Sequence, residues 1–270
     1  MTDIVQGLIL GVVQGITEWL PVSSEGMNTL ILVHFFDEPT GEAIAKSVWL
    51  HVGTLLAAMI YFRNDVSELV RRLPRYVRER RARSSSEPDS LITFLAIATV
   101  LTGAVGAPLM LFELSQESFS GSVGMAVIGA FLMITGVVQK YAGRASGTRV
   151  SVGKRDAVLL GVVQGFAAVP GLSRSGLTVS AFLLRGYEVR QAIRVSFLMS
   201  IPAVLAAEIG LGLIGELSFD AVAISGVVTS FLFGLLTIGV LVRIATRIAF
   251  WKFCLVLGAL SLLPLAIDLV

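Results

Sequence analysis

Two stretches of this chain repeat each other at a constant offset of 150 residues. Residues 11–26 read GVVQGITEWLPVSSEG, and residues 161–178 read GVVQGFAAVPGLSRSGLT. The first five residues of the two stretches are identical, and in each stretch an apolar run then breaks at a proline and resumes in a serine-rich turn. This pattern indicates an internal duplication, with a first repeat over 1–142, a second repeat over 151–270, and a polar site built from both copies.

The composition places the chain in a membrane. Of its 270 residues, 55% are hydrophobic and only 15% are charged, whereas soluble domains carry about 25% charged residues. We therefore expect residues 1–270 to form a single membrane domain with many spans. The lone cysteine, Cys254, excludes an internal disulfide, and because the chain has only two histidines, a zinc site of the His/Cys type is nearly excluded.

Apolar runs of sufficient length predict six transmembrane helices. They lie near 43–62, 91–112, 122–142, 192–213, 220–242 and 253–269. Two further apolar regions are interrupted by a break, namely 4–20 followed by 24–35 and 157–169 followed by 173–185. As a helix, the run 4–20 would reach only about 25 Å, which is short of the ~30 Å hydrocarbon core. Each pair therefore predicts a re-entrant hairpin, which is tolerated at membrane depth where protein shields it.

The placement of basic residues tests this arrangement. Nineteen of the 21 Lys and Arg residues fall in four regions that the six spans put on one side of the membrane: 63–88, 140–156, 185–194 and 243–252. The positive-inside rule assigns this side to the cytoplasm and puts both termini outside. If residues 157–185 crossed the membrane instead, the last two of these regions would move to the outer side. The charges therefore favour the hairpin.

The number of spans between the hairpins predicts their relative orientation. Three spans separate them, and because three is odd, the second copy must enter the membrane from the opposite face. We thus expect an all-α integral membrane protein with an inverted-topology repeat, six spanning helices and two re-entrant helical hairpins. Inverted repeats with broken helices commonly hold a binding site near the bilayer midplane. We expect a multi-pass protein of the cell (plasma) membrane whose active site faces outside.

Arg174 is the residue that most needs an explanation, because an arginine at membrane depth costs roughly 2.5–3.5 kcal/mol. One interpretation is a structural ion pair with Glu18 or Glu208. The interpretation that we favour is recognition of an anion, because Pro170 and Gly171 end one half-helix and Ser173, Arg174 and Ser175 open the next. A helix N-terminus and a planar guanidinium both suit phosphate oxygens. Further contacts to the substrate are expected from Ser173, Ser175, Gly176 and Thr178.

Gln14 and Glu18 are four residues apart and therefore share one face of the first half-helix. A carboxylate in an apolar segment needs a partner, a proton or a metal. Glu18 is therefore an ion-pair partner of Arg174, a general base, or the ligand of a divalent cation, Mg²⁺ or Ca²⁺, that bridges to phosphate. Gln14 either satisfies backbone groups at the break or takes part in catalysis.

The serines at the first break also have two interpretations. Ser23 and Ser24 either cap the second half-helix, or Ser24 binds phosphate or acts as the nucleophile. Glu25 is either another carboxylate that contacts the substrate or a residue at the mouth of the hairpin. We expect His51 to be a packing residue of its span, and Glu208 to be a structural partner or a proton carrier.

Taken together, the motifs resemble one family. QGITEWLPVSS at 14–24 is similar to the (E/Q)xxxE and PVSS motifs of the undecaprenyl-diphosphatase family, which is also associated with bacitracin resistance, and PGLSRSGLT at 170–178 is similar to its PGxSRSxxT motif. The resemblance implies interlocked inverted repeats and a divalent-cation-assisted enzyme. Such an enzyme hydrolyses a polyprenyl diphosphate to the monophosphate plus phosphate, and so recycles the carrier lipid of cell-wall or surface-glycan synthesis. The motif residues implicated are Gln14, Glu18, Ser24, Ser173, Arg174 and Thr178.

Two positions depart from the family pattern, which continues PVSSTGH in bacteria whereas this chain has PVSSEGM. Glu25 stands in place of the threonine and Met27 in place of the histidine, and a thioether cannot move protons. Either the histidine is dispensable here, or Glu18 or Glu25 takes its role, or the chain no longer hydrolyses. Substitution in space by His51 is a further alternative, which nothing in the sequence shows.

The main alternative function is transport, either as a polyprenyl-phosphate flippase or as an anion transporter without hydrolysis, because inverted repeats with charge at the midplane also fit that class. A scaffold for soluble partners is the least favoured class, since it leaves a buried Arg and Glu without a role. The partners that we expect are the polyprenyl diphosphate lipid and the bilayer, and no nucleic acid. Association into a homo-oligomer is left open.

Overall fold

The computed structural model describes residues 2–82, 89–114, 122–145, 147–214, 220–245 and 248–268. These residues form helices and the turns that join them, and the one β-bridge among them pairs Arg149 with Tyr187. The prediction of an all-α protein is confirmed for this part of the chain.

In the described part of the chain, six helical segments are long and apolar enough to cross a membrane, as the sequence predicts. They run over Thr40–Tyr61, Ser90–Phe112, Ser122–Ala142, Val189–Ile214, Ala221–Ile244 and Phe250–Ile267. The predicted bounds differ from these by three residues or fewer. The chain is therefore a multi-pass membrane protein.

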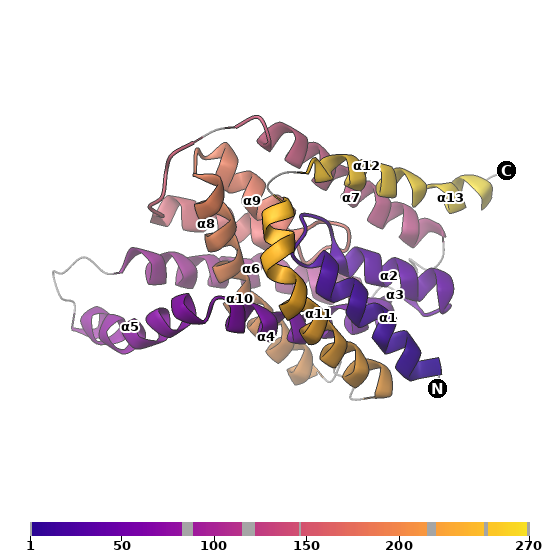
Figure 1. Ribbon diagram of the computed structural model, residues 1–270, viewed down its shortest axis with the longest axis horizontal. Coiled ribbons are helices and arrows are strands. Elements are labelled where there is room, and N and C mark those ends of the chain that lie inside the picture. The colour runs from indigo at the N-terminus through magenta and orange to yellow at the C-terminus, as the bar shows by residue number, and fades with distance from the viewer. Residues whose placement is uncertain are drawn as a thin grey trace.

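The first and the last span each contain two helices in line. In chain order the elements of the six spans are α3 (Thr40–Trp49) with α4 (His51–Tyr61), α6 (Ser90–Leu114), α7 (Ser122–Ala142), α10 (Val189–Ile214), α11 (Ala221–Ala245), and α12 (Phe250–Leu260) with α13 (Leu263–Asp268). Helix α5 (Arg63–Arg81) follows α4 and has no buried residue. In Figure 1, α5 and the connection from α7 to α8 lie at the left, and both chain termini lie at the right.

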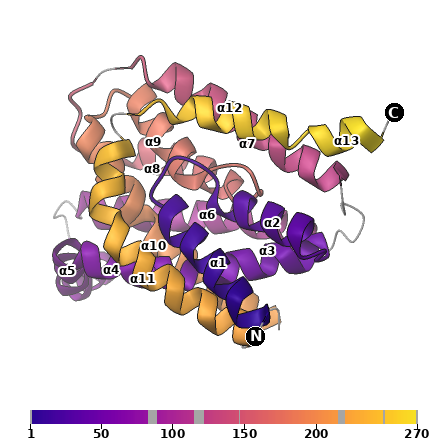
Figure 2. The same cartoon turned by 45° about the vertical axis from the view of Figure 1, so that its right-hand side comes forward.

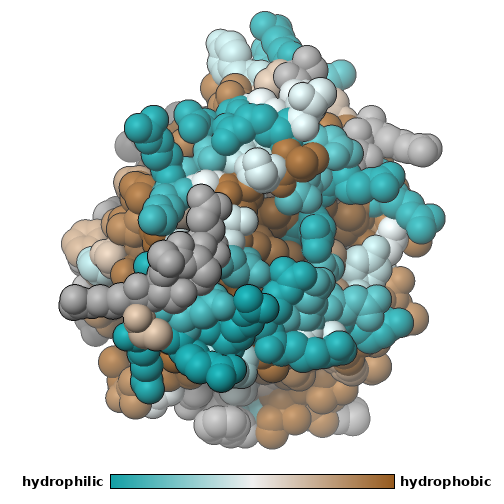
Figure 3. Space-filling model, turned by 90° about the vertical axis from the view of Figure 1, so that its left-hand side faces the viewer, coloured by the Kyte–Doolittle hydropathy of each residue, from teal (hydrophilic) through white to brown (hydrophobic). Residues whose placement is uncertain are grey.

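The left-hand end of the molecule is mostly hydrophilic (Figure 3). Exposed arginines of α5, among them Arg71, Arg75 and Arg78, belong to the basic regions that the sequence assigns to one side of the membrane. Arg83 and Arg247, which belong to the same regions, lie outside the described residues. The arrangement of charge thus agrees with the predicted order of spans along the described chain.

Two pairs of short helices occupy the places of the predicted hairpins. The first pair is α1 (Thr2–Thr17) and α2 (Ser24–Phe35), and the second pair is α8 (Lys154–Phe166) and α9 (Arg174–Leu184). Both pairs break where the sequence predicts, at the proline-containing turn before the serines. That the two hairpins re-enter the membrane, from opposite faces, stays a prediction.

The short helices of each predicted repeat pack against the long helices of the other. Helix α1 packs along α11, and α8 packs along α6, so each hairpin lies against a span of the other repeat. Figures 1 and 2 both show α1 beside α11. Two further contacts also have counterparts. The contact of α2 with α3 corresponds to that of α9 with α10, and the contact of α4 with α11 corresponds to that of α10 with α6. The contacts of one copy thus recur in the other, which is the order that a duplicated chain predicts.

The glycines of the repeated GVVQG motif allow this close packing. A Cβ atom on Gly11 would lie 2.5 Å from the carbonyl oxygen of Gly226 on α11. A Cβ atom on its repeat mate Gly161 would lie 2.7 Å from the carbonyl oxygen of Ala98 on α6. Small residues at such positions let the backbones of membrane helices approach each other. The repeated motif is therefore first of all a helix-packing motif.

A buried carboxylate joins the two ends of the second hairpin. Asp156, in the first turn of α8, accepts hydrogen bonds from Arg149 at 2.9 Å, from Arg185 at 3.0 Å and from the hydroxyl of Tyr187 at 2.8 Å. Burial acts to raise the pKa of Asp156, but the hydrogen bonds from Tyr187 and Arg185 and the charge of Arg149 outweigh it and hold the pKa below its ordinary value. Burial and Asp156 together raise the pKa of Tyr187 to about 12.

Candidate active site

The two helix breaks meet, and each begins its second helix with a serine cap. Ser23 is the N-cap of α2 and accepts a hydrogen bond from the Gly26 N–H at 3.1 Å. Its repeat mate Ser173 is the N-cap of α9 and accepts from the Gly176 N–H, also at 3.1 Å. Caps of this kind satisfy N–H groups that have no partner within the helix. The capping interpretation is thus confirmed for Ser23.

The same two serines connect the hairpins to each other. The Gly171 N–H donates to the Ser23 hydroxyl at 3.1 Å, and the Ser173 hydroxyl donates to the carbonyl of Val22 at 3.0 Å. Gly171 has a φ of +97°, a left-handed conformation that glycine adopts most readily. Through these bonds the N-termini of α2 and α9 are held side by side.

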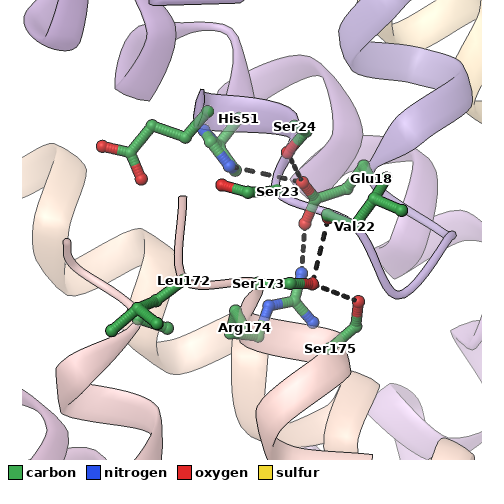
Figure 4. A pocket seen from close by; sticks show the side chains of 11 residues that line it. Glu18, Val22, Ser23, Ser24, His51, Leu172, Ser173, Arg174 and Ser175 are labelled. Carbon is green, nitrogen blue, oxygen red and sulfur yellow. Dashed lines mark hydrogen bonds and ion pairs between the residues drawn. The ribbon is translucent and has the colours of Figure 1, made fainter. Parts of the chain in front are cut away.

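A small cavity of about 40 Å³ lies between the two helix N-termini (Figure 4). Residues of both repeats line it: Glu18, Val22, Ser23, Ser24, Glu25, His51, Ala167, Leu172, Ser173, Arg174 and Ser175. Six residues that the sequence predicts for the site are therefore together here, namely Glu18, Ser24, Glu25, Ser173, Arg174 and Ser175. A site formed by both copies is what the duplication leads one to expect.

The carboxylate of Glu18 is the centre of the hydrogen-bond network in Figure 4. One oxygen accepts from Arg174. The other oxygen accepts from the Ser24 hydroxyl at 2.7 Å and from the Gln14 amide at 3.1 Å, and His51 Nε2 lies 3.3 Å from it. A hydroxyl that donates to a carboxylate held in place by other groups is the arrangement of a nucleophile with its general base.

Gln14 orients Glu18 rather than satisfying the backbone at the break. Its side-chain oxygen accepts from the Asn28 amide at 2.9 Å, so its amide nitrogen faces Glu18. The repeat mate Gln164 donates instead to the Thr102 hydroxyl at 3.1 Å. The two glutamines share a sequence position in the repeat and differ in role, because only the first copy carries a carboxylate four residues later.

Arg174 is the first residue of α9, and only part of its guanidinium is paired. One amino group donates to Glu18, so the ion pair that the sequence left open is present. The other amino group, Nη1, is buried without a hydrogen-bond partner in the described part of the chain. The guanidinium carbon lies 5.6 Å from the centre of the Phe197 ring. Because an unpaired buried donor is costly, the free amino group indicates a binding site for an anion.

His51 lies in this cavity, contrary to the expectation that it packs within its span. It is the first residue of α4, at the junction with α3. Its Nδ1 is 3.1 Å from the carbonyl oxygen of Ser47 and 3.1 Å from that of Val48, and since both of these groups only accept, Nδ1 carries a proton. The remaining ring nitrogen faces Glu18. Met27, at the position of the family histidine, is not among the residues that line the cavity.

Two further carboxylates have oxygens without partners. One oxygen of Glu25 is buried and accepts no hydrogen bond within the described chain, and Glu25 lines the cavity. Both oxygens of Glu208 on α10 are in the same state. The expectation that Glu208 is a structural partner is therefore not supported by any hydrogen bond in the described residues.

Thr178 and Gly176, two predicted substrate ligands, contact residues that surround the small cavity without lining it themselves. The Thr178 hydroxyl donates to the Arg174 carbonyl at 2.7 Å and is 2.6 Å from the Ser196 hydroxyl, so it joins α9 to α10. The Gly176 N–H is used by the cap, and a Cβ atom at Gly176 would lie 2.8 Å from Gln139. Neither residue lines the cavity, and direct contact of either with a substrate stays a prediction.

The described residues do not fit a divalent cation by themselves. Within them, no group of three or more His, Cys, Asp or Glu side chains is arranged to hold a metal ion. Both oxygens of Glu18 already accept hydrogen bonds. Mg²⁺ is commonly held by one or two carboxylates together with substrate phosphates. A role for Mg²⁺ or Ca²⁺ at Glu18 therefore stays a prediction.

A second, larger cavity adjoins the first. It has a volume of about 210 Å³, and it shares Glu25, His51, Ala167 and Arg174 with the small cavity. Its other walls come from α3, α6, α8, the turn after α8, and α10. They are mostly apolar and small: among them are Gly103, Gly106, Ala107, Ala168, Ala203 and Gly210. A polar cavity therefore continues into an apolar one, as a ligand with a charged head and an apolar tail requires.

Comparison with known proteins agrees with the motifs. Residues 7–263 match the family model described as bacitracin resistance protein BacA. A protein of Methanococcoides burtonii named undecaprenyl-diphosphatase is 49% identical over 266 residues, which cover 98% of this chain and 99% of that protein. A protein of the same name from Haloarcula marismortui is 36% identical over 97% of this chain and 97% of that protein. Another from Methanothrix thermoacetophila is 34% identical over 96% of this chain and 96% of that protein. The resemblance seen in the sequence is confirmed, and the chain belongs to the BacA family.

Proposed function

We propose that this protein is an integral membrane phosphatase that hydrolyses a polyprenyl diphosphate of the undecaprenyl type to the lipid monophosphate plus inorganic phosphate. The reaction returns the carrier lipid for another round of synthesis. The observation that carries the proposal is the buried cluster of Ser24, Glu18 and Arg174 at two facing helix N-termini. The names of the relatives support hydrolysis, and no observation favours a transporter without hydrolysis.

The cluster suits a diphosphate for electrostatic reasons. The N-termini of α2 and α9 both border the small cavity, and each carries the positive end of a helix dipole. Nη1 of Arg174 is a free donor for a phosphate oxygen, while the other amino group keeps Glu18 in place. Donors that are fixed before the substrate binds stabilise developing charge without reorganisation.

The geometry supports attack by Ser24. Its Oγ bonds the terminal phosphorus as its proton passes to Glu18, which accepts that hydrogen bond at 2.7 Å. The bond from this phosphorus to the bridging oxygen breaks, and the lipid monophosphate leaves. Water then splits the phosphoserine, which releases inorganic phosphate and restores the hydroxyl. In the alternative, Glu18 activates a water molecule that attacks the terminal phosphorus directly.

The second cavity supports a lipid substrate that arrives from the outer leaflet of the plasma membrane. Helices α6 and α10 both start at the arginine-rich side of the molecule. The cavity is lined by residues 99–110 of α6 and 200–210 of α10, mainly in the halves of these helices that are farther from that side. With the basic regions in the cytoplasm, the site and both termini face outside.

The experiment that tests the proposal is release of inorganic phosphate from a C55 polyprenyl diphosphate by the purified protein in detergent, with and without EDTA. The wild type is expected to release phosphate, and Arg174→Ala to lose roughly 10²–10³-fold in rate because it removes a donor to the transferred group. Arg71→Ala, on the exposed face of α5, is the matched control and is expected to behave like the wild type.

The outcome also separates hydrolysis from transport. If the wild type releases no phosphate in detergent but moves polyprenyl phosphate between vesicle leaflets, the chain is a flippase and the proposal is wrong. If EDTA abolishes release, the cation prediction holds, and if EDTA has no effect, it is wrong.

A further inference from the structure

Two glycines of the membrane spans have no packing reason to be glycine. A Cβ atom built on Gly103 of α6 would meet no atom of the described residues within 4 Å, and the same is true for Gly210 of α10. The glycines of the repeated motif behave in the opposite way, since a Cβ atom on Gly11 or Gly161 would run into a neighbouring backbone. Glycine is the least favourable residue inside a helix apart from proline. Two helix-interior glycines beside open space therefore call for a reason other than packing.

Both glycines line the apolar cavity that adjoins the cluster of Ser24, Glu18 and Arg174. Gly103, Ala107 and Ala206 line this cavity and are also exposed on the surface of their helices. These positions lie within spans, where the surroundings are lipid. The cavity therefore opens sideways into the bilayer, between α6 and α10.

The size of the cavity limits what it accepts. At about 210 Å³ it is smaller than the ~300–1,000 Å³ of typical ligand pockets, so it holds only the start of a long chain. The remainder of such a chain lies in the membrane. The part of a polyprenyl chain next to the diphosphate carries a methyl branch on each isoprene unit. It is therefore wider than a straight alkyl chain, and side chains at the mouth of the cavity would narrow the path that it needs.

We infer that Gly103 and Gly210 keep the cavity wide enough for the first isoprene units of the lipid, and that they set the preference of this protein for a branched chain. The inference rests on the proposed function for its substrate class. The surrounding residues agree with this role, because the rest of the cavity wall is also built of small side chains. These residues are Gly106, Ala107, Ala203 and Ala206.

The test compares Gly103→Leu, Gly210→Leu and the wild type. Phosphate release is measured from a C55 polyprenyl diphosphate and from a straight-chain alkyl diphosphate, and binding of C55 polyprenyl monophosphate and of inorganic diphosphate is measured by native mass spectrometry. Filling the cavity is expected to lower kcat/KM for the polyprenyl diphosphate roughly 10–200-fold. The straight-chain substrate loses less, and binding of inorganic diphosphate, which needs only the polar cavity, stays as in the wild type.

Separate controls test whether the leucine variants stay stable and whether their effect depends on the position of the substitution. Both variants replace a glycine with a better helix former in open space, so their melting temperatures are expected to equal or exceed that of the wild type. Gly239→Leu is the matched control on α11, away from the cavity, where a Cβ atom meets only Tyr61 at 3.6 Å. This control is expected to treat all four ligands as the wild type does.

Three outcomes would each support or contradict the role inferred for Gly103 and Gly210. If the two variants hydrolyse and bind the polyprenyl lipid as the wild type does, the inference is wrong. It is equally wrong if they lose the branched and the straight substrate to the same extent. If the wild type binds the polyprenyl monophosphate but hydrolyses nothing, the proposed function fails, while weakened lipid binding by the two leucine variants still supports the inference.

Discussion

At the scale of single residues, the proposed mechanism depends on the hydrogen bond from Ser24 to Glu18. We expect Ser24→Ala and Glu18→Gln each to lose roughly 10²–10⁴-fold in phosphate release, because in the proposed mechanism the first removes the nucleophile and the second removes its base. Ser67→Ala, a half-buried serine on α5 that lines neither cavity, is the control and is expected to be fully active.

The identity of the nucleophile is read from the intermediate. Acid quenching during turnover is expected to trap a phosphoserine at Ser24 in the wild type. If instead Ser24→Ala still transfers ¹⁸O from water to phosphate in a single turnover at the wild-type rate, water attacks directly and Ser24 only binds.

At the scale of elements, the hairpins depend on the tight turn at Gly171. Its φ of +97° is unfavourable for other residues, and a Cβ atom there would lie 2.4 Å from the carbonyl oxygen of Ile128 on α7. We expect Gly171→Ala to lower the free energy of unfolding by about 2–4 kcal/mol, from strain and overpacking together. Thermal unfolding in detergent measures the loss.

A variant of a second glycine distinguishes the loss of stability due to backbone strain from the loss due to overpacking. Gly186 has a φ of +77°, but a Cβ atom there meets only Arg149, at 3.9 Å. Gly186→Ala is therefore expected to cost about 1–2 kcal/mol from strain alone. Equal losses in the two variants would mean that the contact with Ile128 adds nothing.

The end of the second hairpin makes stability depend on pH. Asp156 has a pKa below its ordinary value of 3.8, so its charged form stabilises the folded state at pH values above 3.8, and this contribution is lost as the pH falls through the lowered pKa. Asp156→Asn is expected to remove roughly 1–2 kcal/mol at neutral pH, the low end of the range for charged hydrogen bonds, because the two arginines are partly exposed. The measurement is the melting temperature from neutral pH down to about pH 2, which includes the range in which a carboxylate with a lowered pKa titrates. A variant with an unchanged acid dependence would contradict this assignment.

At the scale of the whole molecule, orientation in the membrane is open to direct measurement. Glu42 is exposed at the start of the first span, and Arg78 is exposed on α5, the helix that follows the other end of that span. We expect an impermeant thiol reagent to label Glu42→Cys in intact cells and Arg78→Cys only in inverted vesicles. The native Cys254 is fully buried and contributes little background. The reverse pattern of labelling would put the site on the cytoplasmic side.

Much of the architecture can be predicted from local patterns of the sequence. The six apolar runs and the two interrupted ones predict the spans and the short helices to within a few residues, because the length of an apolar run is read directly against the thickness of the bilayer. Arg174 and Glu18 stand out as site residues for a related reason, since a charge in an apolar segment requires a partner or a ligand. The identity of the two GVVQG motifs predicts the duplication and the site shared between copies.

What the sequence by itself determined is therefore the set of spans, the two breaks and the charges that they carry, because each follows from composition within a short window. Tertiary structure alone decided which neighbours these residues meet. It turned His51 toward Glu18, gave Gln14 and Gln164 different partners, put Thr178 behind the site, and left open space beside Gly103 and Gly210. The physical reason is that a helical pattern shows which residues share a face, whereas the partner of that face is set by how helices distant in the chain pack together.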